Sequence, residues 1–204
     1  MQVQTRITQE NLTAKGVYNI LVEGNDRFIQ NAKTERNLLE QVLETSKGQY
    51  PFAVVLSCID SRVPVELVFD LGIGDIFSVR VAGNIVNEDV LGSMEYACKV
   101  AGSKLVIVMG HSKCGAVTAA CQNVELGNIT PLLQKIKPAV DVIKGNDEEM
   151  SDVSIEAVAV RNVKLSIERI RKESPILAEM EKGGEIEVVG AMYDVVSGKV
   201  DFFK

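Results

Sequence analysis

Apolar residues recur with two different periods along the chain. Three short continuous apolar runs, at 52–58, 75–83 and 104–110, predict buried strands that are covered on both faces. The segment 185–203 predicts a strand, a turn at Ser-Gly and a short return strand. These patterns predict a sheet whose inner strands have no solvent-exposed face.

Helical periodicity separates the predicted strands. Apolar residues fall three and four positions apart in 13–46, 87–101, 115–122 and 151–172. Within the first of these segments, Gly24 is expected to bend or divide the helix. Alternating strands and helices predict an α/β fold with a mostly parallel central sheet flanked by helices, preceded by an N-terminal helical extension.

The length of 204 residues favours a single domain over 1–204, and no convincing boundary divides it. A polar surface loop is expected over 144–152.

The net charge of −6 argues against nucleic acid and against an anionic membrane surface as partners. The first ten residues lack an apolar core, so no signal peptide is expected, and no apolar run is long enough to span a bilayer. We therefore expect a cytoplasmic protein whose four cysteines serve metal binding or catalysis rather than disulfides.

The stretch "SCIDSR" puts three reactive side chains at every second position. Cys58, Asp60 and Arg62 come at the end of the run 52–58. If strand geometry continues through them, the thiol, the carboxylate and the guanidinium point the same way. The stretch therefore predicts a functional site at the end of a buried strand.

A second strand end carries matching chemistry. The run 104–110 leads into His111, the chain's single histidine, and then to Cys114. Sites in α/β proteins form where the carboxyl ends of parallel strands meet. We therefore expect Cys58, Asp60, Arg62, His111 and Cys114 to converge at one edge of the sheet.

Two thiolates and one imidazole make a ligand set suited to catalytic Zn²⁺, which prefers tetrahedral sulfur and nitrogen coordination with one position left open. Asp60 can take or vacate that fourth position, and Arg62 can hold it away from the metal through a two-pronged ion pair. A structural zinc site with four permanent ligands would explain Asp60 but leave Arg62 without a role. The other cysteines, Cys98 and Cys121, lie in helical patterns and are expected to be small buried residues.

The motifs also resemble a known family. The segments "CIDSRVPVELVFDLGIGDIFSVRVAGNIV", "SMEYA" and "VMGHSKCGAV", together with "EGNDRF" and "MYDVVSGKVDFF", are similar to the β-class carbonic anhydrases over nearly the whole chain. The resemblance implies that Cys58, His111 and Cys114 bind Zn²⁺ and that Asp60 and Arg62 form a catalytic pair. In a closed state of the site, Asp60 would itself bind the metal.

The resemblance implies further site residues and an assembly. Gln49 would bind a substrate oxygen, Phe77 and Tyr96 would wall the pocket, and Gly115 would lie beside the metal. The family unit is a homodimer, sometimes paired into a homotetramer. Residues 1–46 would then form a helical arm that packs on the neighbouring subunit, and both subunits would contribute pocket walls. An ordinary turn residue and two core aromatics remain the alternative for Gln49, Phe77 and Tyr96.

The implied activity is that of a carbonate dehydratase, a zinc lyase that hydrates carbon dioxide reversibly to bicarbonate and a proton by means of a zinc-bound hydroxide. Two alternatives remain open from the sequence. One is a hydrolase for carbonyl sulfide or carbon disulfide on the same fold, since those substrates need the same nucleophile. The other is a non-catalytic zinc-binding protein.

Overall fold

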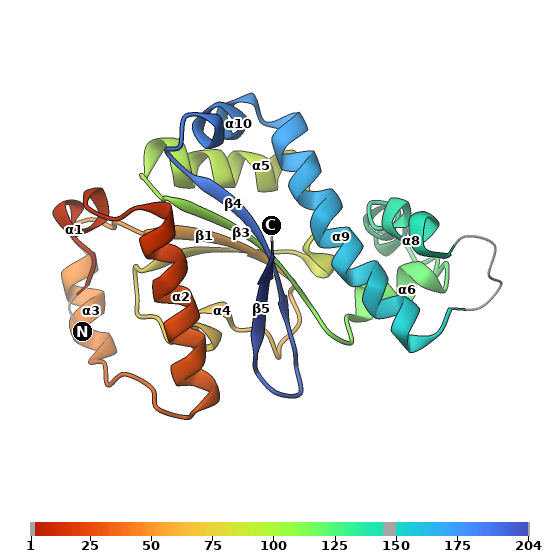
Figure 1. The fold of residues 1–204 in the computed structure, drawn as a ribbon, viewed down its shortest axis with the longest axis horizontal. Helices are drawn as coiled ribbons and strands as arrows, with labels where there is room; N and C mark the ends of the chain where they lie inside the picture. The colour runs from red at the N-terminus through yellow and green to blue at the C-terminus, as the bar shows by residue number, and fades with distance from the viewer. Residues whose placement is uncertain (1–2, 145–149, 204) are drawn as a thin grey trace.

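A single sheet runs through the middle of the molecule (Figure 1). In the computed structural model, which describes residues 3–144 and 150–203, five strands pair in the order β2-β1-β3-β4-β5. The first four are parallel, and β5 returns antiparallel to β4. The strands are β1 (Ala53–Ser57), β2 (Ile76–Arg80), β3 (Leu105–His111), β4 (Glu187–Tyr193) and β5 (Val200–Phe203). The mostly parallel α/β fold is confirmed.

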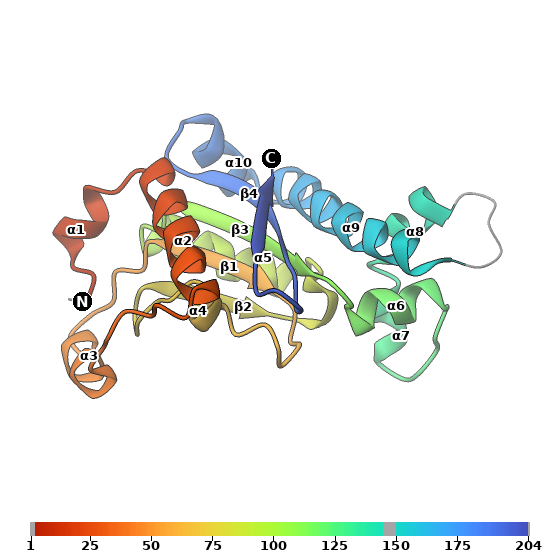
Figure 2. The same cartoon turned by 60° about the horizontal axis from the view of Figure 1, so that its bottom comes forward.

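Helices cover both faces of the sheet and its carboxyl edge (Figure 2). One face is covered by α2 (Ala14–Ile29) and α4 (Val65–Val68). The other is covered by α5 (Glu88–Glu95), the π-helical turn η2 (Tyr96–Val100), α9 (Asp152–Glu173) and α10 (Pro175–Lys182). Beyond the carboxyl ends of the strands lie α6 (Gly115–Cys121), α7 (Ile129–Leu133) and α8 (Lys137–Lys144). The remaining elements are α1 (Arg6–Glu10), α3 (Leu38–Thr45) and the 3₁₀ turn η1 (Ala82–Asn84).

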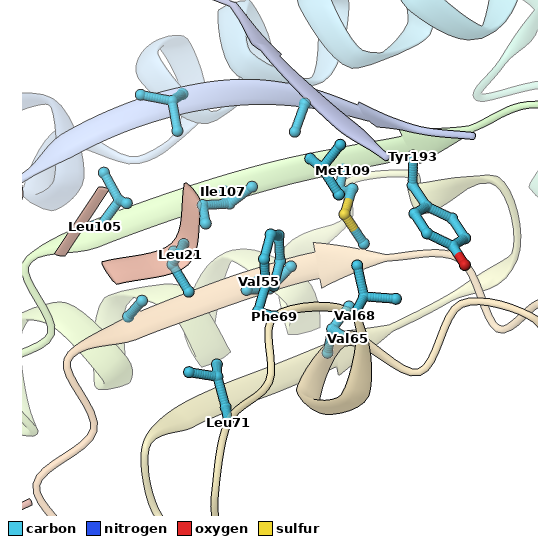
Figure 3. Packing of buried hydrophobic residues seen from close by; sticks show 14 of the residues in the cluster. Leu21, Val55, Val65, Val68, Phe69, Leu71, Leu105, Ile107, Met109 and Tyr193 are labelled. Carbon is cyan, nitrogen blue, oxygen red and sulfur yellow. The ribbon is translucent and has the colours of Figure 1, made fainter. Parts of the chain in front are cut away.

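The inner strands alternate between two separate apolar cores. Val55 of β1 and Ile107 of β3 face α2 and α4, where Leu21 and Phe69 close the core (Figure 3). Their sequence neighbours point to the opposite face and pack against α5, α9 and α10. Because every side chain of β1 and β3 is buried, these strands read as continuous apolar runs, as the sequence predicts.

The strand β2 departs from this expectation. It lies at the edge of the sheet, its residues are half-buried or exposed, and no strand of the described chain pairs with its outer side. An apolar run alone could not distinguish this edge strand from an inner one, because its Phe77 and Val79 do pack partly against the α5 face.

Gly24 does not divide its helix, so of the expected bend or division the division is wrong. The helix α2 runs unbroken from Ala14 to Ile29 because Gly24 allows a close approach: a Cβ at this position would overlap the carbonyl oxygen of Phe69. Val17 and Leu21 of the same helix are fully buried against the chain's own sheet. Residues 1–46 are expected to form an arm that packs on a neighbouring subunit. The helix α2 within this segment instead packs into the core of its own chain.

A buried ion network ties the segment before α3 to the body of the molecule. Asp70 is 3% exposed and accepts hydrogen bonds from Arg27, Arg36 and Thr34. Burial opposes its ionisation, but the two guanidinium groups and Thr34 hold the pKa of Asp70 well below its usual range. The network fixes where α3 begins, whereas α3 itself keeps its apolar residues largely exposed.

The remaining helical predictions are confirmed. The pattern over 87–101 becomes α5 and its π-helical continuation, 115–122 becomes α6 and 151–172 becomes α9. In the loop expected over 144–152, residues 145–149 lie outside the described residues. No helix in the described part of the chain combines the length and apolar character that crossing a bilayer requires.

The role of Gly24 can be measured. We expect Gly24→Ala to lower the free energy of unfolding by about 2 kcal/mol, because the added methyl group meets a backbone carbonyl that can move only with α4. Gly16→Ala in the same helix is the control. Its Cβ would come no closer than 3.4 Å to any atom outside the helix backbone, so this variant should be neutral or should stabilise the protein by up to about 1 kcal/mol. Equal urea denaturation midpoints for the two variants would contradict the account.

Candidate metal centre

Three metal-binding side chains meet at the carboxyl edge of the sheet. Cys58 follows β1, His111 ends the adjacent parallel strand β3, and Cys114 caps the start of α6. Their ligand atoms all lie within 4.8 Å of one another. The side chains are 4%, 0% and 3% exposed, respectively. The predicted convergence of these three residues is confirmed.

His111 presents one nitrogen for a metal. Its Nδ1 lies 2.9 Å from the carbonyl oxygen of Ser112 and donates to it, so Nε2 carries the free lone pair. Among the described residues, this buried Nε2 has no hydrogen-bond partner. A buried imidazole nitrogen beside two sulfur atoms, with no other partner, fits a Zn²⁺ ligand.

A hairpin from the far end of the chain supports His111. The Ser112 hydroxyl donates to Asp194 at 3.0 Å and accepts from the Val195 N–H at 3.0 Å. Hydrogen bonds from the Val196 N–H and the Ser197 hydroxyl lower the pKa of Asp194 to about 2. Asp194 therefore stays ionised at neutral pH and anchors the residue whose carbonyl orients the imidazole.

The two cysteine sulfurs differ in how readily they lose their protons. A hydrogen bond from the Cys114 thiol, against the opposing effect of burial, lowers the pKa of Cys58 to about 4. The same hydrogen bond, together with burial, raises the pKa of Cys114. Cys58 therefore ionises before Cys114, and Cys114 releases its proton when a cation binds.

Gly83 completes the surroundings of Cys58. Its N–H donates to the Cys58 sulfur at 3.3 Å, and its carbonyl accepts from Asn162 of α9 at 2.8 Å. Its φ of 65° lies in the left-handed region, and a Cβ there would press on Ile136 and Ala116. Only glycine can therefore present this N–H to the sulfur without displacing the neighbouring helices.

Asp60 and Arg62 form a two-pronged ion pair beside the ligands. Arg62 Nε donates to Asp60 Oδ1 at 2.9 Å and Nη2 donates to Oδ2 at 2.7 Å, while the backbone N–H of Arg62 also reaches Oδ1. These bonds hold the pKa of Asp60 well below its usual range. The same carboxylate lies 3.9 Å from Nε2 of His111, so it faces the metal position while Arg62 restrains it.

The pair is not brought together by a continuing strand, contrary to expectation. The strand β1 ends at Ser57, and the chain turns at 61–62. Arg80, at the end of β2, holds this segment by donating to the carbonyls of Cys58 at 3.0 Å and Asp60 at 2.6 Å. Sequence reasoning missed Arg80. Its position opposite Ser57 in the parallel register is the signal that could have found it.

The four expected pocket residues lie in different places. Gly115 follows Cys114 directly, and a Cβ there would meet no atom within 4 Å. Gln49 is exposed and precedes the amino end of β1, away from Cys58. Phe77 and Tyr96 contact each other edge to face, with ring centroids 6.2 Å apart, and line a hollow between β2 and α5. One chain alone does not bring Gln49, Phe77 or Tyr96 to the ligands.

The remaining two cysteines are buried elsewhere. Cys98 packs in the core under α5, where burial raises its pKa to about 12, and Cys121 packs in the helical cluster around α6. All four cysteines are free thiols. The expectation that Cys98 and Cys121 are small buried residues is confirmed.

The ligand set predicts how zinc binding depends on each thiol. We expect about one Zn²⁺ per chain, lost in Cys58→Ser and in Cys114→Ser, because a serine hydroxyl does not replace a thiolate as a ligand. Cys98→Ser, at an equally buried cysteine outside the cluster, should keep its zinc. Metal analysis after dialysis against a weak chelator measures this. Full zinc occupancy in Cys58→Ser would refute the assignment.

Comparison with known proteins places the chain in a family. The family model described as carbonic anhydrase matches residues 53–200. Carbonic anhydrase 2 of Mycobacterium tuberculosis is 32% identical over 195 residues, which cover 93% of this chain and 92% of the relative. The crystal structure of the β-carbonic anhydrase CafA of Aspergillus fumigatus matches with a TM-score of 0.75 and 28% identity over 81% of each chain.

A second solved structure shares the fold. It is one of two tetrameric β-carbonic anhydrases from Sordaria macrospora and matches with a TM-score of 0.73 and 21% identity, covering 92% of this chain and 96% of that one. The extent of the family match, the similarity over nearly the full length of the relative and the Cys-His-Cys cluster agree with one another. This chain belongs to the β-class carbonic anhydrase family, whose members use zinc.

Proposed function

We propose that the chain hydrates carbon dioxide reversibly at the Cys58–His111–Cys114 centre, with Asp60 and Arg62 as its catalytic pair. One water molecule adds its oxygen and one of its hydrogens to carbon dioxide, which gives bicarbonate. The other hydrogen of the water leaves as a proton. The observation that carries the proposal is the restrained carboxylate. Asp60 faces the metal position, but both of its carboxylate oxygens accept hydrogen bonds from the Arg62 guanidinium.

The roles of the pair follow from its geometry and charge. When bound, zinc supplies a Lewis acid that makes water ionisable near neutral pH. Asp60, kept ionised by Arg62, can accept a hydrogen bond from the attacking oxygen and orient its lone pair toward carbon. If Arg62 releases it, Asp60 is the nearest carboxylate to fill the fourth metal position, which would close the site at low pH.

In this proposal, both copies of the chain in a dimer contribute walls to the pocket. Carbon dioxide is small and uncharged, so its pocket needs apolar walls beside the metal. Phe77 of β2 and Tyr96 of η2 line a hollow at the open β2 edge and are available to a neighbour, and Gln49 lies four residues after the end of α3. Gln49 of the neighbour would donate to the oxygen that gains charge, while Gly115 leaves space beside Cys114.

Several surfaces support a homodimer. Residues Leu38, Leu39, Val42 and Leu43 of α3 are between 50% and 81% exposed, which is unusual for one apolar helix face. The unpaired edge of β2 and the half-exposed Tyr96 add to this surface. The structure from Sordaria macrospora is described as tetrameric, so further pairing of dimers is part of the proposal. Four free cysteines are consistent with a cytoplasmic location.

The catalytic roles are tested by separating activity from metal binding. Asp60→Asn and Arg62→Ala should keep zinc but lose about 10²–10⁴-fold in hydration rate, because both side chains orient the nucleophile rather than hold the metal. Stopped-flow hydration with a pH indicator, combined with zinc analysis, measures both quantities. Wild-type turnover in either variant would exclude the pair, and an inactive, zinc-loaded wild type would refute the proposed activity.

The pH profile follows from the charge of the ligands. Two ionised sulfurs neutralise the charge of a divalent cation, so the cation would lower the pKa of a bound water less than it does with three neutral imidazole ligands. With three imidazoles, that pKa is about 7. We expect the hydration rate to rise with pH, with a midpoint above about 7. Protonation of Asp60 itself does not cause this rise. Its lowered pKa keeps it ionised above about pH 4, so the ion pair is lost only in stronger acid. Initial rates from about pH 6 to 9.5 that are flat, or highest near pH 6, would contradict the argument.

The assembly is tested on α3. We expect the double substitution Leu39→Asp, Leu43→Asp to produce a folded monomer with little hydration activity, because charges at these exposed positions disturb a neighbour but no core. Val142→Asp on α8, also an exposed apolar position, is the control and should leave the assembly intact. Sedimentation velocity and circular dichroism measure mass and folding. A fully active monomer would show that one chain forms a complete pocket.

A further inference from the structure

Lys113 links the metal ligands to the catalytic pair through its backbone. It lies between His111 and Cys114 and has a φ of 54°, in the left-handed region that residues with a Cβ adopt only under constraint. Such a conformation persists where surrounding contacts hold it. The contacts of Lys113 therefore show what the structure requires at this position.

Both polar backbone groups of Lys113 are engaged. Its N–H donates to Oε1 of Glu156 at 2.7 Å, and its carbonyl oxygen accepts from Nη2 of Arg62 at 3.2 Å. Glu156 lies in the first turns of α9, which pass beside α6 at the carboxyl edge of the sheet (Figure 2). A continuous chain of hydrogen bonds thus runs from α9 through Lys113 and Arg62 to Asp60.

The ion pair needs such an anchor. The Arg62 side chain is 48% exposed and that of Asp60 17%, and solvent-exposed ion pairs define side-chain geometry poorly because water competes and a long side chain loses entropy. The Lys113 carbonyl gives the guanidinium a second fixed acceptor. That carbonyl points correctly only while residue 113 keeps its left-handed conformation.

We propose that Glu156 is a positioning residue for the Asp60–Arg62 pair: its carboxylate oxygen holds the Lys113 backbone so that the Lys113 carbonyl fixes Arg62. The inference rests on the proposed function, since it explains how the catalytic pair of that function is kept in place. In this role the Glu156 side chain is a hydrogen-bond acceptor that is long enough to meet the Lys113 N–H. Its charge is not needed for this role.

Three substitutions separate reach from charge. Glu156→Gln keeps an acceptor oxygen at the same reach, whereas Glu156→Asp keeps the charge but is one methylene too short, and Glu156→Ala removes both. We expect kcat/KM for carbon dioxide to fall about 10–100-fold in the Asp and Ala variants, as misplacement of a reacting group does, and to stay within about twofold of wild type in the Gln variant. Zinc content should be unchanged in all three.

A second measurement is independent of turnover. In zinc-loaded protein labelled with ¹⁵N-arginine, the Nε–H of Arg62, assigned by its absence in Arg62→Lys, should exchange with water faster in the Asp and Ala variants but not in Glu156→Gln. Glu168→Ala is the matched control, because Glu168 lies on the same helix and pairs only with Arg161 among the bonds seen for it. It should change neither readout.

The outcomes decide the proposal. A lower kcat/KM and faster Arg62 exchange in Glu156→Asp, with wild-type values of both in Glu156→Gln, support the proposal. If kcat/KM fell as much in Glu156→Gln as in Glu156→Ala, the charge of Glu156 would be what matters, and the proposal would be overturned. An unchanged Arg62 exchange rate in Glu156→Ala would also overturn it. If wild-type protein did not hydrate carbon dioxide, the proposed function would fail, yet the exchange measurement would still report whether Glu156 positions Arg62.

Discussion

The structure depends on the side-by-side ending of two buried parallel strands. Because β1 and β3 pair in register, with Ser57 opposite Met109, the residue after β1 and the last residue of β3 come to the same edge. This places the Cys58 sulfur beside the imidazole of His111 in a region from which water is excluded. A buried imidazole nitrogen with no partner among the described residues and buried thiolates would be costly without a cation, so the metal and the fold stabilise each other.

The groups around the ligands come from widely separated parts of the chain. Gly83 after β2, Asp194 after β4 and Arg80 at the end of β2 each fix one ligand or the segment beside it. None of them touches the metal position, and each acts through a backbone group or a hydroxyl. Such an arrangement holds the reacting groups in place before substrate arrives, so that little reorganisation is needed during the reaction.

The sequence predicted the parts of the fold and site that depend on local pattern. The inner strands and α9 follow from apolar periodicity, and the ligands follow from the rarity of histidine and from cysteines at strand ends. The edge position of β2 and the unbroken helix at Gly24 could not be foreseen, because they depend on which neighbour packs against them. Arg80 and Glu156 were missed for the same reason, since each serves a backbone group distant in sequence. Gln49, Phe77 and Tyr96 lie away from the ligands within one chain, which local pattern along the sequence could not show.

In the proposed mechanism, Arg62 holds Asp60 away from the metal, so that the fourth position remains exchangeable. Zinc K-edge X-ray absorption of the wild-type protein at about pH 8.5, with and without azide, tests this most directly. We expect two sulfur ligands, one imidazole nitrogen and one further light-atom ligand that azide replaces. A spectrum with four protein ligands that azide leaves unchanged would contradict the account and would indicate a structural zinc site instead.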